Sequence, residues 1–136
     1  MKIRRYLMSL ATGLAVLVGG IVVAPAPAQA AVKWDLTGSY SDMAGSWAYG
    51  SWWWSGGRFY VEVNVKDTVA DGEAAGMCLR AEYSDGGSRK ERVHNSGGKG
   101  TTKTVTYNFA DNVSEIYGGE YVGGATTGCL AVGIIY

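Results

Sequence analysis

The chain has 136 residues with twelve basic and twelve acidic side chains, so its formal net charge at pH 7 is zero. A balanced charge without a long Lys/Arg cluster makes nucleic acid and anionic lipid poor candidate ligands. Two cysteines and one histidine are too few for a closed zinc site. We therefore expect no nucleic-acid partner and no structural zinc.

Residues 1–30 have the features of an export signal. Lys2, Arg4 and Arg5 form a charged start, an apolar run follows, and Ala28-Gln29-Ala30 gives the small-x-small pattern of a signal-peptidase site. The apolar run could nearly span a bilayer, so an uncleaved anchor is the alternative. We predict cleavage and a secreted, extracellular protein that no longer contacts the membrane. Its mature part has 106 residues and a net charge of −3, because the signal removes three basic residues and no acidic ones.

The mature chain begins with a segment of weak pattern. Residues 31–45 are polar and contain Gly and Ser without a clear period. We expect a flexible N-terminal arm here that becomes ordered on a partner. The folded domain is then expected over residues 46–136.

From residue 46 onward the sequence indicates strands separated by glycine-rich turns. Apolar and polar residues alternate over 59–66, 77–83 and 104–109, the period-two pattern of a strand with one buried face. The run at 129–136 is apolar on both sides, as expected for a strand in the middle of a sandwich or beneath another element. No window has the stripe and caps of an amphipathic helix. We predict one all-β domain of seven or eight short antiparallel strands, a β-sandwich or jelly roll, with a flattened barrel as the alternative.

The two cysteines predict a covalent link within this domain. Cys78 and Cys129 both lie in the mature part, and no further cysteine is left over. In an exported chain, that count indicates one intramolecular disulfide. Closing a loop of about fifty residues stabilises the fold by roughly 4 kcal/mol in the chain-entropy model.

The stretch WAYGSWWWSGG at 47–57 concentrates four of the five tryptophans. If it is one strand, Trp47, Tyr49 and Trp53 share one face, and Trp52 and Trp54 share the other. The first set is bulky and continuous, so we assign it to the core. Trp52 and Trp54 then stand side by side on the outside as a ligand face.

Two points qualify this assignment. A bulge at Gly50 or Ser51 would reverse the facing and expose Trp53 instead. The segment before the strand adds two more aromatic residues, Trp34 and Tyr40. The predicted partner-contacting residues are therefore Trp52 and Trp54, together with Trp34 and Tyr40.

Residues that could support catalysis are sparse. His94 is the only imidazole, and it lies where a predicted strand enters the turn at 95–98. A hydrolase of the Ser-His-Asp kind needs a base beside its nucleophile, and an exposed loop histidine is the simpler interpretation. Glutamates occur without a motif that pairs two of them, and the glycines at 97–102 lack the spacing of a phosphate-binding loop. We therefore expect no enzymatic activity.

The loop after the predicted strand at 59–66 is acidic. Asp67, Asp71 and Glu73 lie within seven residues, with a glycine that permits a sharp turn. Calcium prefers several such oxygens, but the spacing is not that of an EF-hand. A turn in which Asp71 caps backbone amides is the alternative. We expect no cofactor, with calcium at these three carboxylates as the competing hypothesis.

A sequence pattern in the same loop is similar to that of a known group of proteins. The pattern Val-x-Asp-Thr-x-Ala-Asp-Gly at 65–72 precedes the Cys78 strand, and a second cysteine follows near the C-terminus. With the alanine-rich signal and the high glycine content, this pattern resembles small, mostly uncharacterised secreted β-sandwich proteins of actinobacteria of the Streptomyces type. The resemblance covers about residues 59–136. Some small secreted proteins of these bacteria are adaptors of antibacterial toxin particles that link a lectin-like subunit to a long repeat-bearing toxin chain. The resemblance implies a secreted component of an assembly and brings no catalytic residues.

Two functional hypotheses follow. Exposed Trp and Tyr can anchor a protein interface, or their flat rings can stack on sugars. The first hypothesis is a secreted non-enzymatic module that holds a protein partner through the Trp-rich strand. The alternative is a carbohydrate-binding domain for cell-wall or environmental glycans.

Overall fold

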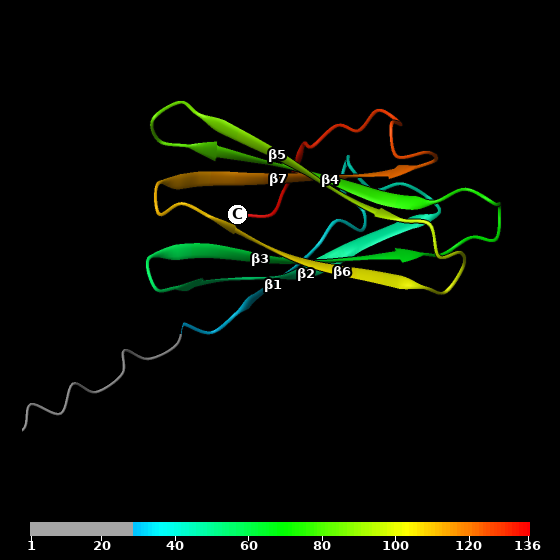
Figure 1. Cartoon of the computed structure of the whole chain (residues 1–136), viewed down its shortest axis with the longest axis horizontal. Helices are drawn as coiled ribbons and strands as arrows, with labels where there is room; N and C mark the ends of the chain where they lie inside the picture. Colours follow the sequence, from blue (N-terminus) through cyan, green and yellow to red (C-terminus); the bar gives the residue numbers. More distant parts are fainter. Residues whose placement is uncertain (1–28) are drawn as a thin grey trace, which may run out of the picture.

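The structure is a computed structural model that describes residues 29–136, and they fold into strands joined by turns (Figure 1). All but the last two residues of the predicted signal at 1–30 lie outside the described residues. The strands are β1 (Val32–Asp35), β2 (Ser46–Ser55), β3 (Arg58–Asp67), β4 (Ala75–Tyr83), β5 (Ser88–Asn95), β6 (Thr102–Phe109), β7 (Val113–Val122) and β8 (Gly133–Ile134). Over this part of the chain, no helix is long and apolar enough to cross a membrane.

The strands form two antiparallel sheets that lie one on the other in Figure 1. Sheet A has the order β1-β2-β3-β6, and sheet B has the order β5-β4-β7-β8. Neither sheet closes into a barrel, because each ends in strands with one neighbour. The predicted β-sandwich is confirmed, and the flattened barrel is wrong.

The core lies between the sheets and follows the predicted alternation. In β3, every second residue from Phe59 to Val65 is fully buried, and Met77, Leu79 and Ala81 of β4 face them from sheet B. β6 adds Phe109 at one end. Burial on one side of each strand therefore defines an inner and an outer face for each sheet.

The structure differs from the flexible arm expected at residues 31–45. Val32–Asp35 pair with β2 as an edge strand of sheet A. Trp34 and Leu36 point into the core, with only 8% and 1% of their surface exposed. A four-residue strand carries too short an alternation to be recognised among the polar residues around it, which is why the segment read as unpatterned.

The C-terminal run at 129–136 was expected to be a strand in the middle of the sandwich or beneath another element, and the structure corrects this expectation. Only Gly133–Ile134 form a strand, β8, which is the edge of sheet B beside β7. Ile135 faces the core, whereas Ile134 on the other side is largely exposed. The apolar residues on both sides of this run therefore do not indicate burial on both sides.

Candidate functional site

The consecutive tryptophans of β2 alternate between the faces of sheet A, and their facing is the reverse of the predicted one. β2 pairs with β3 without a bulge, so that Trp52 lies opposite Val61 and Trp54 lies opposite Phe59. Directly opposed residues share a face of the sheet. Because Val61 and Phe59 are fully buried, Trp52 and Trp54 face the interior and pack against the core.

The two inward tryptophans belong to an aromatic cluster at one end of the sandwich. Their ring centroids lie 5.4 Å and 4.9 Å from that of Phe59, and Tyr136 at the C-terminus packs 4.4 Å from the same ring. Further along the same face, β2 has the fully buried Ala48 in place of a large side chain. The bulkier set of side chains was assigned to the core, and this assignment was wrong. The large inward residues of β2 lie at one end of the sandwich, and the small Ala48 lies further in.

Four aromatic side chains remain on the outer face of sheet A, where they are half-buried. Trp47 and Tyr49 pack together with ring centroids 4.3 Å apart, and Trp53 stacks on Tyr60 of β3 at 5.5 Å with planes within 5°. We call these four residues the aromatic row. Three of them were predicted to form the core, so the row was missed.

Polar contacts fix one end of the aromatic row. The indole Nε1 of Trp47 donates to the carboxylate of Asp35, with distances of 3.2 Å and 3.3 Å to its two oxygens. The ammonium of Lys66 lies 5.9 Å from the centroid of the Trp47 ring, close enough for a cation–π contact. The ring of Trp47 is thus held in one orientation at the surface.

Between the two aromatic pairs, the sheet presents polar side chains. Ser51 of β2 lies between Lys33 of β1 and Glu62 of β3, its direct partners in the register. The amide of Asn64 donates to Glu62 Oε1 at 3.2 Å, and its oxygen accepts from the hydroxyl of Thr104 at 2.6 Å. The outer face of sheet A thus presents hydrogen-bond donors and acceptors next to the aromatic rings of β2 and β3.

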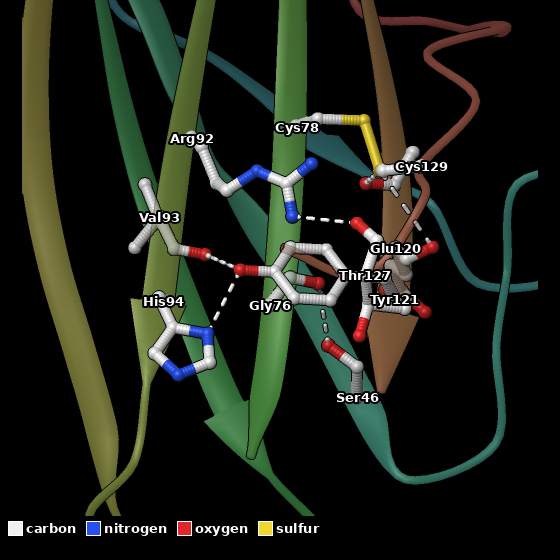
Figure 2. Close-up of a disulfide and its surroundings, with 11 residues drawn as sticks. Ser46, Gly76, Cys78, Arg92, Val93, His94, Glu120, Tyr121, Thr127 and Cys129 are labelled. Carbon is white, nitrogen blue, oxygen red and sulfur yellow. Dashed lines mark hydrogen bonds between the residues drawn. A yellow bond between two sulfur atoms is a disulfide. The ribbon is translucent and has the colours of Figure 1, made fainter. Parts of the chain in front are cut away.

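The outer face of sheet B is built differently, around the disulfide (Figure 2). Cys78 of β4 is bonded to Cys129, which lies 51 residues further along the chain, so the predicted disulfide is confirmed. The segment after Cys129 crosses over β7 so closely that a Cβ on Gly119 would lie 1.9 Å from the carbonyl oxygen of Leu130. Glycine at that position is what allows this close approach.

Next to the disulfide, the ring of Tyr121 lies beneath the side chain of Arg92 (Figure 2). Tyr121 of β7 is fully buried over Gly76, where any Cβ would overlap its ring. Its hydroxyl lies 2.9 Å from Nδ1 of His94. The guanidinium of Arg92 lies 4.5 Å above the Tyr121 ring and donates to the carbonyl of Thr127 at 2.8 Å. His94 is thus part of a packed contact between β5 and β7 and not an exposed loop residue.

A hollow of about 630 Å³ opens between strands β4 and β5 and the segment that follows Cys129. Basic and apolar residues line it together with the disulfide and one acidic residue, Glu91; the others that matter here are Arg80, Lys90, Arg92, Leu130 and Val132. A second hollow of about 460 Å³ lies on the other side of Val132, between β8 and the Gly38–Tyr40 turn. The two hollows share Val132, so both border the segment that leads from Cys129 into β8.

Four apolar side chains that line these two hollows stand open to solvent, and we call them the apolar edge. Tyr40 is fully exposed, and Leu130 and Ile134 expose 78% and 77% of their surface; Val132 exposes half. Tyr40 is the one predicted contact residue that the structure leaves fully open. Trp34, by contrast, is a core residue and is not available to a partner.

The predicted calcium ligands do not converge. Asp67 is buried, and its Oδ1 accepts the backbone N–H of Val69 at 3.1 Å. Asp71 accepts the N–H of Glu73 at 2.9 Å, which is the capping turn given as the alternative. Among residues 29–136, no three His, Cys, Asp or Glu side chains are grouped as metal ligands.

Glu120 of β7 is a buried carboxylate that the sequence did not reveal. Its Oε1 accepts the N–H of Ala48 at 2.6 Å and its Oε2 accepts the N–H of Met43 at 2.8 Å. Burial raises the pKa of Glu120 to about 7, against the effect of these two bonds, and the nearby Asp42 raises it further. Glu120 thus ties the segment between β1 and β2 to sheet B, and only knowledge of the strand pairing could have identified it.

Two surfaces therefore emerge, the aromatic row on the outer face of sheet A and the apolar edge at the border of sheet B. Comparisons of the chain with models of known families, with curated proteins and with solved structures found no match.

Proposed function

We propose that the mature chain is an exported, non-enzymatic interaction module that holds a protein partner at its apolar edge, as a component of a secreted, toxin-type assembly. One observation carries the proposal: four bulky apolar side chains are open to solvent around a single strand. Apolar patches of this kind on a small soluble domain usually mark an interaction site. Covering them removes their apolar surface from water and favours association.

The backbone around the apolar edge supports a protein as the occupant. β8 is the last strand of sheet B and pairs only with β7, over two residues. An unpaired strand edge offers N–H and C=O groups to an extended segment of another chain. The partner would add a strand to β8 and place alternate side chains against Val132 and Ile134.

The charged residues beside the apolar edge indicate which kind of partner segment would fit. Arg80, Lys90 and Arg92 line the larger hollow together with Leu130 and Glu91. Arg80 is paired with Glu82 at 2.8 Å, so Lys90 and Arg92 supply most of the free positive charge. A partner segment with carboxylates on one side and apolar residues on the other is complementary to this surface. The disulfide supports export, because such bonds persist in oxidising compartments. The earlier hypothesis of a contact through Trp52 and Trp54 is replaced by this surface.

The test uses the tagged mature protein as bait in the culture supernatant of the producing cells. We expect one secreted protein to co-purify in stoichiometric amount, and its purified form to bind the bait in calorimetry. The double variant Leu130→Lys, Ile134→Lys should weaken that binding about 30-fold or more, as expected when central apolar anchors are lost. Val69→Lys is the matched control, because Val69 is an exposed apolar residue of a different loop.

Two results would overturn the proposal. One is equal binding by the wild type and the double variant, which would place the partner elsewhere. The other is a dimer in sedimentation equilibrium that the double variant abolishes, which would show that the apolar edge is covered by a second copy of this chain.

A further inference from the structure

The aromatic row lies on the opposite sheet from the apolar edge, so a partner at β8 leaves it open. Residues around the row, among them Lys33, Thr106 and Asn108, are exposed, which shows that this side of sheet A faces solvent. Stability alone does not require three large aromatic residues of β2 on an outer face, because the core is formed by the other side of the strand. The row is thus a second surface that is open to a ligand of its own.

We propose that the aromatic row binds an uncharged polysaccharide chain laid along β2. The faces of indole and phenol rings are electron-rich and attract the weakly positive C–H groups of a sugar ring. From Trp47 to Trp53 the row extends about 20 Å at the usual rise of a strand, which is long enough for several sugar units. The two aromatic pairs, at the two ends of this line, would each pack against one unit.

The polar centre of the row supplies what sugar hydroxyls need. Each hydroxyl both donates and accepts a hydrogen bond, and Ser51 does the same from the sheet side. Lys33 is a donor and Glu62 an acceptor, on either side of Ser51 in the register. A protein partner would instead favour a dry apolar centre, with charged residues at the rim.

The charges around the row favour a neutral ligand. Two lysines and two carboxylates are interspersed there: Lys33, Lys66, Asp35 and Glu62. Arg58, two residues from Tyr60 on the same face, adds a third cation, whose Nε donates to Asn108. Both signs are thus present in near balance, and an anionic polymer would still meet two carboxylates beside the rings. Uncharged glycans carry no such penalty.

The rings are also held in place before any ligand arrives. Asp35 fixes Trp47, Tyr60 stacks on Trp53, and Asn64 is bonded on both sides. A surface whose side chains are already ordered loses less entropy on binding. We therefore expect binding without a change in the sheet.

The experiment measures retention of the mature, oxidised protein on insoluble chitin, cellulose, xylan, mannan and β-glucan, followed by titration with a soluble oligosaccharide of the retained type. We expect retention on at least one of them and quenching or shift of tryptophan fluorescence on titration. Trp53→Ala and Trp47→Ala should each weaken binding at least about tenfold, and Trp53→Phe should restore part of it. Circular dichroism and thermal unfolding verify that the variants are folded.

Two matched controls separate this site from the apolar edge. Tyr117→Ala removes an aromatic side chain from the outer face of the other sheet, where it pairs in register with Arg80, and should leave retention unchanged. The double variant Leu130→Lys, Ile134→Lys should also be retained fully, even if it has lost its protein partner. The inference is overturned if none of the five polysaccharides retains the wild type, or if the folded double variant Trp47→Ala, Trp53→Ala is retained as well as the wild type.

Discussion

The outer faces of the two sheets are built on different principles. On sheet A, the four rings of the aromatic row belong to the regular register of β2 with β3, and β1 adds the contact of Asp35 with Trp47. On sheet B, the outer surface is a later segment of chain laid across β7 and fixed by the Cys78–Cys129 bond. The aromatic row thus follows from strand pairing alone, whereas the apolar edge depends on a covalent link between residues that are distant in sequence.

The apolar edge and the aromatic row should differ in how they respond when the domain is destabilised. Side chains on paired strands keep their positions as long as the sheet is intact. The segment over sheet B contributes only the short strand β8, and its exposed apolar residues give it little burial of its own. We therefore expect the apolar edge to be lost before the aromatic row when the domain is perturbed.

The largest expected effect comes from removing the disulfide. In the double variant Cys78→Ala, Cys129→Ala, the free energy of unfolding should fall by about 3 to 4 kcal/mol, because the unfolded chain regains the entropy of an open 51-residue loop. Urea unfolding measures this loss. Hydrogen exchange should show the earliest loss of protection at residues 133–136, whose backbone is bonded to β7, while the amides of β2 and β3 stay protected. Equal deprotection of both sheets would contradict the contrast between the two faces.

A smaller effect should separate two neighbouring tryptophans. Trp52→Ala should cost about 2 to 3 kcal/mol, because it opens the aromatic cluster around Phe59. Trp53→Ala loses only a surface stack on Tyr60 and should cost about 1 kcal/mol or less. Thermal and urea unfolding of the two variants, measured side by side, test the facing of β2. Equal losses, or the reverse order, would contradict it.

The facing of β2 shows where sequence reasoning stopped short. The alternation in β3 identified its buried side correctly, because Val and Phe occupy one face and polar residues the other. β2 carries large aromatic residues on both faces, so bulk could not choose between them. The deciding information lies in the turn: Gly56 and Gly57 both have positive φ, and this two-residue turn places Ser55 opposite Arg58. That register makes Trp54 the neighbour of Phe59 and turns it inward.

Other parts of the fold depended on contacts that no local pattern records. The number of strands and the disulfide followed from alternation, turn residues and an even cysteine count. The edge position of β8 did not, because a run such as 129–136 reads as a buried strand whether or not another strand covers it. β1 was missed for the opposite reason, since Trp34 and Leu36 are buried only by elements distant in sequence. The apolar edge could not be inferred without the sheet order.

The smallest of the three effects concerns pH and the link between the two sheets. Because the pKa of Glu120 is raised to about 7, the folded state binds a proton between about pH 4.5 and pH 7 that the unfolded state has already released. The free energy of unfolding should therefore decrease as the pH rises through this window, by about 2 kcal/mol, and level off above it. Urea unfolding at pH 5, 6, 7 and 8 measures the slope.

Variants assign that slope to one carboxylate. Glu120→Gln has no proton to exchange and should flatten the dependence, although it also weakens one of the bonds to Met43 or Ala48. Glu73→Gln, which alters an exposed glutamate, should keep the slope. Since Glu120 holds the segment that leads from β1 to β2, its ionised form should loosen Tyr40 and the apolar edge more than the aromatic row. A slope that persists in Glu120→Gln would show that another group links the stability of the domain to pH.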